Sequence, residues 1–395
     1  MARGALQGIK VLECGSLVAA AYAAKLLADL GADVLKVEPP QGDAARWRGP
    51  FPDGKPDPEK SGLFLYLNTN KRGIVLDPQA PSHRRVWHAL VKAADLVVHN
   101  VPPPAAESEG LSWDELRTVN PRVVLVSITP FGCSGPHRNY AATDIVSWSA
   151  GGLAYLNGAG PGSDDLPPLK PFGNQAEFQS GLNAAVAGLG ALFARRRTGR
   201  GQHVVISAQE CVAAILELTF EYYPYMGLIA SRLGQKPIQP LDFLPCRDGW
   251  IFLCCVEEHQ WQRFVELMGH PEWADLEIFA DRLSRARNWD ALKLLLSEWT
   301  ATQSVEDLYR AGQARRIPLA PVSTMGDLFA SEQLRSRGFF ATIEDPRVGR
   351  VTMPGAPYRL QRTPWALRRP APRLGEHNEQ ILSAWSWEVP GEEAR

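Results

Sequence analysis

Apolar residues along the first third of the chain alternate between short continuous runs and runs at helical spacing. Runs of the strand type lie at 10–14, 33–38 and 95–99. Between the first two, residues 19–30 carry apolar side chains at helical spacing, and Gly31 after them is a favourable C-cap. Strands that alternate with helices of about ten residues favour a parallel sheet with helices on both faces. The pattern therefore predicts an α/β domain.

The same rhythm continues beyond this region, so further elements can be assigned from the apolar pattern. We predict strands at 63–67, 74–77, 123–128 and 203–208, and helices at 86–94, 113–119 and 181–196. The last helix consists mostly of small residues, which let another backbone come close, and is expected to be buried. Residues 151–173 are rich in Gly, Pro, Ser and Asp and predict a long surface loop, a class of loop that often carries function.

The pattern changes from residue 241 onward. Asp248 and Gly249 lie between two apolar runs and predict the tight turn of a hairpin. Helical spacing follows to about residue 313, so this stretch predicts a smaller α+β domain. Short strands and turns return at 339–362. The Pro- and Arg-rich run 363–373 has too few large apolar residues for a core and is expected to lie along a surface.

Composition narrows the class of protein. The chain has 395 residues, which at about 150 per domain corresponds to two or three domains, or to one large domain with an insertion. Its formal net charge of −1 gives no overall field to hold nucleic acid or an anionic membrane, so neither is an expected partner. The first ten residues lack a signal-peptide core, no apolar run approaches the roughly 20 residues of a membrane span, and six cysteines are too sparse for a disulfide scaffold. These observations predict a cytoplasmic protein.

Several familiar motifs are missing from the sequence. The turn after the first strand, residues 14–19, has one glycine where a dinucleotide-binding fingerprint needs three. The sequence contains no P-loop, no C-x-x-C pair and no G-x-S-x-G elbow, and its eight histidines are scattered. We therefore expect no metal site, no nucleotide cofactor and no α/β-hydrolase chemistry.

Glu177 is the carboxylate whose position is most suggestive. It lies just before the small-residue helix, which opens at Gly181. Because a helix dipole stabilises negative charge at this end, the pattern alone predicts a lowered pKa and a simple N-terminal carboxylate. The arginines at 195–197 lie at the C-terminal end of the same helix. Cations there offset the negative end of the helix dipole, and we favour this role over a ligand-binding site.

Short stretches in order along the chain carry a family resemblance. They are GIKVLE at 8–13, LADLGADVLKVEPPQGD at 27–43, LNTNKR at 67–72, ADLVVHN at 94–100, NPR at 120–122, PFG at 130–132, RTGRGQ at 197–202 and LGEHN at 374–378. Each stretch is a weak motif alone. Together they resemble the class III CoA-transferases, a family that includes formyl-CoA transferases, carnitine CoA-transferase and the 2-methylacyl-CoA racemases.

The resemblance implies a fold in which two subunits form an intertwined, ring-like homodimer. Each subunit would have a Rossmann-like large domain with a parallel sheet, built from both chain ends, and a smaller α+β domain. The large domain would begin with residues 1–200 and continue, after a linker at 201–224, into a small domain at 225–320. Residues 321–395 would form the return linker and the C-terminal part of the large domain.

The resemblance also implies a catalytic role for Glu177. The family's catalytic aspartate stands four residues before the glycine that opens the small-residue helix, and Glu177 has this position relative to Gly181. In the implied reaction the carboxylate attacks an acyl-CoA thioester to give a mixed anhydride, and the CoA thiolate then forms an enzyme-bound thioester. Glutamate is competent for these steps, although its side chain is one methylene longer.

Coenzyme A or acyl-CoA is implied as a substrate, with no tightly bound cofactor. Lys71 and Arg72 would meet the CoA phosphates and Asn100 would lie near the adenine; a solvated turn at Lys71 and Arg72 is the less favoured alternative. The full set of implied CoA-binding residues is Ser16, Leu17, Ala19, Lys71, Arg72, Asn100 and Val101.

The sequence also departs from the family pattern. Val18 stands where many relatives have a glutamine, while Pro102 and Ser108 stand where arginines are common. Thr143 stands where the racemases have a histidine, and threonine cannot abstract a Cα proton near neutral pH, which disfavours a racemase.

These departures leave alternatives to an acyl-CoA:carboxylate CoA-transferase. The chain could be a catalytically silent family member, or a non-catalytic subunit that pairs with a paralogue in a heteromer. The acid is not named by the sequence. Four apolar residues are expected near the entrance of the active site. They suggest an acyl group bulkier or less polar than oxalate, unless these residues belong to the core. They are Leu17, Val18, Trp148 and Tyr155.

Overall fold

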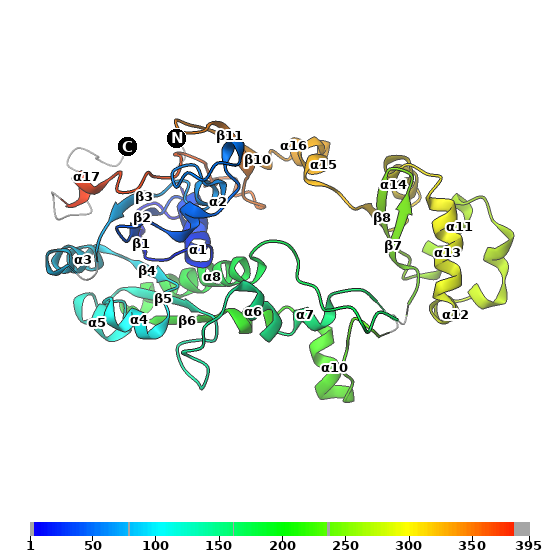
Figure 1. The fold of residues 1–395 in the computed structure, drawn as a ribbon, viewed down its shortest axis with the longest axis horizontal. Coiled ribbons are helices and arrows are strands. Elements are labelled where there is room, and N and C mark those ends of the chain that lie inside the picture. Colours follow the sequence, from blue (N-terminus) through cyan, green and yellow to red (C-terminus); the bar gives the residue numbers. More distant parts are fainter. Residues whose placement is uncertain (1–3, 78–79, 161, 235–237, 383–395) are drawn as a thin grey trace. The chain divides into compact units, whose positions relative to one another are not determined.

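The structure is a computed structural model of the chain and describes residues 4–77, 80–160, 162–234 and 238–382 (Figure 1). The described residues divide into two compact units. Unit 1 comprises those up to Gly158, Pro167–Ala230 and those from Gly338 onward; unit 2 comprises Ala159–Leu166 and Ser231–Arg337. The domain limits implied by the family resemblance stay a prediction.

A parallel sheet of six strands forms the centre of unit 1 (Figure 1). Its strands run in the order β3-β2-β1-β4-β5-β6, and every neighbouring pair is parallel. The prediction of a parallel α/β sheet is therefore confirmed. The strands are β1 Lys10–Glu13, β2 Asp33–Glu38, β3 Arg72–Val75, β4 Leu96–His99, β5 Val124–Thr129 and β6 His203–Ser207.

Helices cover both faces of this sheet. Alternate strand residues point to opposite faces, so Val11 of β1 packs with residues of α1 and α8, whereas Leu12 packs with residues of α3 and α5. All six residues of β5 are buried, as expected of a strand covered on both sides. The helices of unit 1 are α1 Ala19–Asp29, η1 Ala44–Trp47, η2 Pro52–Gly54, α2 Gly62–Leu67, α3 Pro81–Ala93, α4 Pro103–Ser108, α5 Trp113–Val119, α6 Asp144–Ala150, α7 Leu153–Leu156, α8 Gln175–Thr198, α9 Ala208–Ala213, α10 Leu218–Met226 and α17 Asn378–Leu382.

The strand predicted at 63–67 is wrong, because these residues lie in the helix α2. The Ser61 side chain accepts a hydrogen bond from the backbone N–H of Phe64 at 3.1 Å and so caps the helix. Phe64 and Leu67 are buried. A short apolar run does not distinguish a buried strand from a buried helix by periodicity, and the N-cap serine was the signal that could have decided it.

A segment near the C-terminus makes hydrogen bonds to the outer strand of the sheet. Beyond the antiparallel pair β10 Phe340–Asp345 and β11 Gly349–Pro354, the chain returns to β3. The backbone N–H of Gly73 donates to Nδ1 of His377 at 3.1 Å, and that of Val75 donates to the Asn378 side chain at 2.8 Å. The LGEHN motif at 374–378 therefore provides hydrogen-bond acceptors for two backbone N–H groups at the outer edge of strand β3.

A second link between the two chain ends passes through Glu59. One carboxylate oxygen lies 3.0 Å from the Arg46 guanidinium, and the other lies 3.1 Å from that of Arg347. Both arginine side chains are almost completely buried. Glu59 therefore joins an N-terminal and a C-terminal segment of unit 1.

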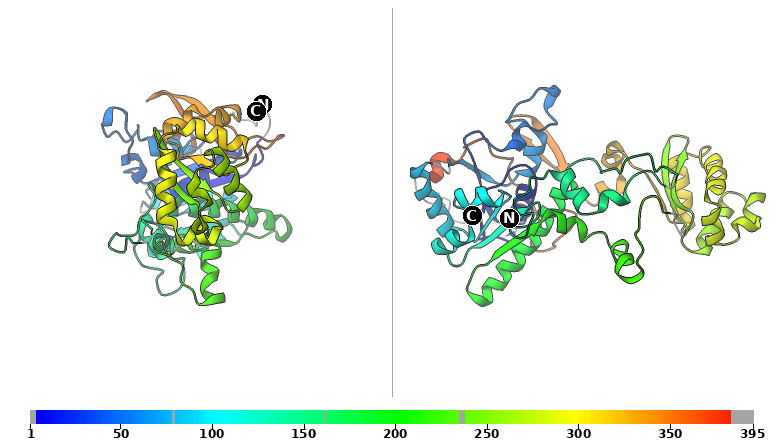
Figure 2. Two further views of the ribbon diagram at one scale, coloured as in Figure 1. Left: turned by 90° about the vertical axis from the view of Figure 1, so that its right-hand side faces the viewer. Right: turned by 60° about the horizontal axis from the view of Figure 1, so that its bottom comes forward.

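Unit 2 contains a three-stranded antiparallel sheet in the order β7-β8-β9. Cys246 pairs with Gly249, so the predicted hairpin is confirmed, but its turn consists of Arg247 and Asp248, and Gly249 already begins the next strand. Figure 2 shows helices of this unit beside the hairpin, and their contact buries Leu244, Ile251 and further apolar residues. The elements are β7 Leu241–Cys246, β8 Gly249–Cys254, β9 Leu319–Pro321, α11 Glu258–Leu267, η3 Glu272–Asp275, η4 Glu277–Phe279, α12 Arg282–Arg287, α13 Trp289–Thr300, α14 Val305–Ala314, α15 Met325–Ala330 and α16 Glu332–Ser336.

In the described part of the chain, no helix combines the length and the apolar character that crossing a bilayer requires.

The Glu59 link can be tested by removing its charge. We expect Glu59→Gln to lower the free energy of unfolding by about 1–3 kcal/mol, because two buried guanidinium groups each lose an ionised partner. The matched control is Glu107→Gln, whose ion pair with Arg138 is solvent-exposed and is worth less than about 1 kcal/mol. Chemical denaturation of the two variants measures both effects, and equal losses would contradict this account of the link.

Candidate active site

The turn between β1 and α1 is held by Asn100, which follows β4. Its side-chain oxygen accepts the backbone N–H of Ser16 at 2.8 Å, and its amide nitrogen donates to the Ser16 carbonyl at 2.7 Å. A single amide thus fixes both backbone groups of Ser16. Two of the predicted CoA-binding residues are brought together in this way.

Asp43 supports the same turn from the segment after β2. One of its oxygens accepts hydrogen bonds from the Ser16 hydroxyl at 3.1 Å and from the backbone N–H groups of Leu17 and Ala45, both at 2.8 Å. The other oxygen lies 2.7 Å from the fully buried ammonium of Lys36. Burial raises the pKa of Asp43, but Lys36 and these hydrogen bonds outweigh it and hold the pKa below its usual value.

Leu17 adopts an unusual backbone conformation within the turn. Its φ of 61° lies in the left-handed region, where a side chain of this size costs about 1–3 kcal/mol. The hydrogen bond from its N–H to Asp43 helps to hold this conformation. Sequence reasoning did not single out Asp43, although it ends the family-like stretch 27–43.

Helix α8 comes very close to the start of α1. A Cβ atom at Gly181 would stand 2.6 Å from the carbonyl oxygen of Ala19, so no other residue fits there without a shift. Three residues earlier, Phe178 packs edge-on against Tyr22 with ring centroids 4.7 Å apart. This approach brings Glu177, in the first turn of α8, to the backbone of Val18.

Burial dominates the electrostatics of Glu177. Burial, and next the Asp144 carboxylate, raise the pKa of Glu177 to about 7, while a hydrogen bond from the Val18 backbone and the charge of Arg48 oppose the rise. Its Oε2 atom is buried and has no hydrogen-bond partner among the described residues. The lowered pKa expected from the helix dipole is therefore wrong, because lost solvation and a second carboxylate outweigh the dipole.

Asp144 contacts Glu177 from the first residue of α6. Its Oδ1 accepts the Glu177 backbone N–H at 3.0 Å, and its Oδ2 lies 3.0 Å from the ammonium of Lys170. Sequence analysis identified neither Asp144 nor Lys170. Asp144 lies 33 residues before Glu177 and Lys170 only seven residues before it, and no spacing rule connects either residue with Glu177.

Lys71 and Arg72 are engaged in ion pairs. The ammonium of Lys71 is fully buried and donates to Glu13 at 3.0 Å, to the Ala21 carbonyl at 2.8 Å and to Asn68 at 2.8 Å. Burial lowers the pKa of Lys71 to about 8, and Glu13 opposes this. Arg72 is also buried and pairs with Asp33 at 2.7 Å. The alternative of a solvated turn is therefore wrong, and contact with CoA phosphates stays a prediction that requires Lys71 to exchange one of these bonds.

The remaining predicted residues lie around the turn or in the core. Ala19 is the first residue of α1, and the Val101 N–H donates to Nδ1 of His99 at 3.2 Å. Val18 and Trp148 are core residues, which removes them as indicators of the acyl group. Tyr155 in α7 is half-exposed.

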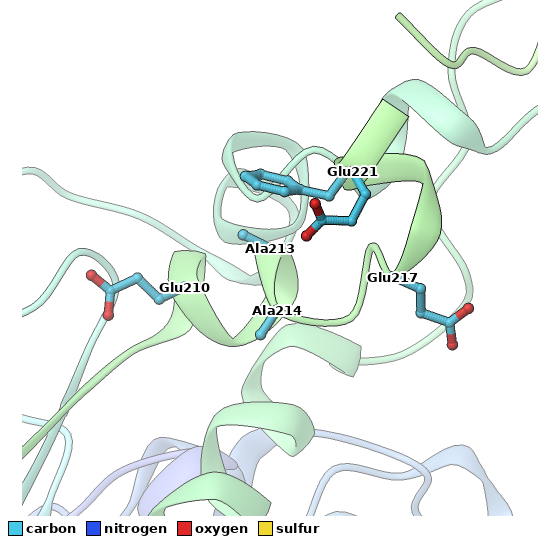
Figure 3. Close-up of a pocket in the computed structure, with 6 residues that line it drawn as sticks. Glu210, Ala213, Ala214, Glu217 and Glu221 are labelled. Atoms are coloured by element: carbon cyan, nitrogen blue, oxygen red, sulfur yellow. The ribbon is translucent and has the colours of Figure 1, made fainter. Parts of the chain in front are cut away.

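A separate cavity of about 490 Å³ lies beside α9 and α10. It is lined by Glu210, Ala213, Ala214, Glu217, Phe220 and Glu221, none of which belongs to the predicted site. The side chains of Glu210 and Glu217 point away from each other (Figure 3), so they do not converge on one ligand. Within the described ranges, no group of three or more His, Cys, Asp and Glu side chains could hold a metal ion.

The chain matches a known protein family over almost its whole length. The model described as CoA-transferase family III matches residues 6–378. The chain belongs to this family. The membership inferred from the dispersed motifs, GIKVLE at one end and LGEHN at the other, is thus confirmed.

Individual relatives agree over nearly the whole chain. The chain is 35% identical over 372 residues to succinyl-CoA:(R)-benzylsuccinate CoA-transferase subunit BbsE of Thauera aromatica, covering 91% of this chain and 90% of the relative. It is 30% identical to succinate–glutarate CoA-transferase of Agrobacterium fabrum, covering 96% and 95%. The crystal structure of a CAIB/BAIF family protein from Brucella suis is similar with a TM-score of 0.87 and 31% identity, over 97% of this chain and 100% of that one.

The raised pKa of Glu177 makes a prediction about stability. The folded state holds this proton up to about pH 7, whereas an ordinary glutamate loses it near pH 4.5, so ionisation costs folding free energy between these values. We expect Glu177→Gln to match the native protein below pH 4.5 and to be about 1–3 kcal/mol more stable above pH 7. Denaturation across this pH range measures the difference. Glu107→Gln serves as the control, and a difference that does not grow with pH would contradict the burial argument.

Proposed function

We propose that this protein transfers CoA between an acyl-CoA donor and a carboxylic acid, with Glu177 as the covalent nucleophile. The observation that carries the proposal is the Glu177 carboxylate, whose Oε2 is buried and has no hydrogen-bond partner in the described ranges, held against the strained turn that precedes α1. Membership of CoA-transferase family III supplies the reaction class. The match of Glu177 to the catalytic position of the family supplies the residue.

The chemistry follows from the carboxylate. Its oxygen attacks the thioester carbonyl, a C–O bond forms as the C–S bond breaks, and CoA leaves as a thiolate. The thiolate then attacks the Glu177 carbonyl, which releases the acyl group as a free acid and leaves a glutamyl-CoA thioester. The acceptor carboxylate repeats the sequence in reverse and departs as the new CoA ester. Every bond made is matched by one broken, so no external oxidant or reductant is needed.

The environment of Glu177 suits this role. A carboxylate with a pKa of about 7 is a stronger nucleophile than one in water, and it is still largely ionised just above neutral pH. Its unpartnered Oε2 is not stabilised by a hydrogen bond that the attack would have to break. Glu177 accepts a hydrogen bond from the backbone of Val18, which lies between the predicted CoA-binding residues Leu17 and Ala19, so the proposed nucleophile adjoins the predicted CoA site.

The names of the relatives indicate which substrates to test. One is named for succinyl-CoA and benzylsuccinate, the other for succinate and glutarate. We therefore propose succinyl-CoA as the donor and a second dicarboxylic acid as the acceptor.

Exposed apolar side chains support the proposal that the chain assembles. Val186 and Phe193 of α8, and Phe220, Tyr225 and Met226 of α10, are each more than half exposed. Exposed apolar surface of this kind marks sites of interaction with another chain. We propose an intertwined homodimer. The heteromer with a paralogue is kept as the alternative because the relative from Thauera aromatica is named as a subunit.

Mass spectrometry can test the nucleophile. After incubation with succinyl-CoA and quenching with hydroxylamine, we expect a hydroxamate on the peptide that carries Glu177, because hydroxylamine attacks activated carboxyls and spares ordinary ones. Glu177→Gln should lose the adduct and several orders of magnitude in turnover while it still binds CoA. Full activity in Glu177→Gln would remove Glu177 as the nucleophile.

Glu177→Asp is the matched control for geometry. It keeps the charge and shortens the reach by one methylene, so we expect activity to fall by about a hundredfold, as a misplacement of about an ångström does. Raised activity would mean that the pocket is still shaped for aspartate. No adduct on a native protein that binds CoA would favour the silent-subunit alternative, which a co-purified paralogue would then test.

A further inference from the structure

Lys170 makes a set of contacts that the proposed reaction does not use. Its ammonium lies 3.0 Å from Oδ2 of Asp144, donates to the Pro171 carbonyl at 3.0 Å and also donates to the Gly173 carbonyl. The side chain is only 18% exposed, although it comes from a surface loop. The ammonium therefore ties the last residues before α8 to the first residue of α6.

Asp144 extends this contact to the proposed nucleophile. Its second oxygen, Oδ1, accepts the Glu177 backbone N–H at 3.0 Å. One carboxylate thus bridges a lysine and the first turn of α8. The Asp144 side chain is 10% exposed, so its charge is poorly screened by water and acts strongly on its neighbours.

We infer that Lys170 is a positioning residue that acts on Glu177 through Asp144, by holding that carboxylate against the first turn of α8 and neutralising its charge. The inference deepens the proposed function and rests on it for its kinetic consequences. Its electrostatic consequences depend only on the structure. An experiment can therefore contradict the inference about Lys170 without contradicting the proposed function, and the reverse.

The charges around Glu177 favour an indirect effect. The groups that act on it are Asp144 from α6, and Asp43 and Arg48 from the segment after β2, together with the Val18 backbone. Lys170 is not among these principal influences, but its partner Asp144 is the strongest charged one. Without Lys170, the Asp144 charge would be unpaired and would oppose ionisation of Glu177 more strongly.

The test is a double-mutant cycle on the pKa of Glu177. The pKa is read from ¹³C NMR titration of protein labelled at the glutamate carboxyl carbon, with Glu177→Gln to assign the resonance, and no CoA is present. Lys170→Met should raise the pKa by about one unit, and Asp144→Asn, which keeps the hydrogen-bond acceptor, should lower it by about one unit. Lys170→Gln is measured beside Lys170→Met, and Lys170→Arg should restore the native value.

The cycle separates an indirect effect from a direct one. If Lys170 acts through Asp144, Lys170→Met in the Asp144→Asn background should move the pKa by less than about 0.3 unit. An equal rise in both backgrounds, or no rise in either, would overturn the inference.

Kinetics give a second readout. With succinyl-CoA, Lys170→Met should slow acylation about fivefold at pH 7 and recover at pH 9, with KM unchanged, because only the ionised fraction falls. A loss that is the same at every pH would indicate a merely structural role and would also overturn the inference. If the native protein is never acylated, the proposed function fails, while the NMR cycle still decides the role of Lys170.

Discussion

The close crossing of α1 and α8 at Gly181 is the constraint on which the site depends. With a Cβ atom at that position only 2.6 Å from the Ala19 carbonyl, the two helices can meet as they do only because the side chain is absent. The crossing fixes Glu177 one turn earlier on α8, where it leaves water and reaches the Val18 backbone. Backbone proximity thus determines where the carboxylate lies, and the resulting burial determines its charge.

Buried charged side chains support the turn between β1 and α1, which faces α8 across the site. Lys36 lies 2.8 Å from Glu13 and 2.7 Å from Asp43, and all three side chains are fully buried. Asp43 in turn holds Leu17 in its left-handed conformation. Removing a member of such a set leaves an uncompensated charge in the interior, which is strongly destabilising. The strain at the turn is therefore maintained by an ionic framework, whereas Glu177 makes no ion pair with a cation in the described part of the chain.

The sequence predicted what depends on local pattern and missed what depends on distant contacts. Apolar runs located the parallel strands, and dispersed motifs located the family and the position of Glu177. The run at 63–67 was misassigned because a buried strand and a buried helix share the same apolarity. The pKa of Glu177 was predicted in the wrong direction because the helix dipole is a local property, whereas the burial of the side chain and the approach of Asp144, 33 residues earlier in the chain, depend on tertiary packing.

The central claim is that a desolvated Glu177 carboxylate attacks the thioester. Its most direct test is the pH dependence of the single-turnover rate at which succinyl-CoA releases CoA, since this step needs only the ionised side chain. The account predicts a rate that rises with pH and levels off above an apparent pKa of about 7. A rate that is already constant from pH 5.5 upward would show an ordinary, solvated carboxylate and would contradict the account.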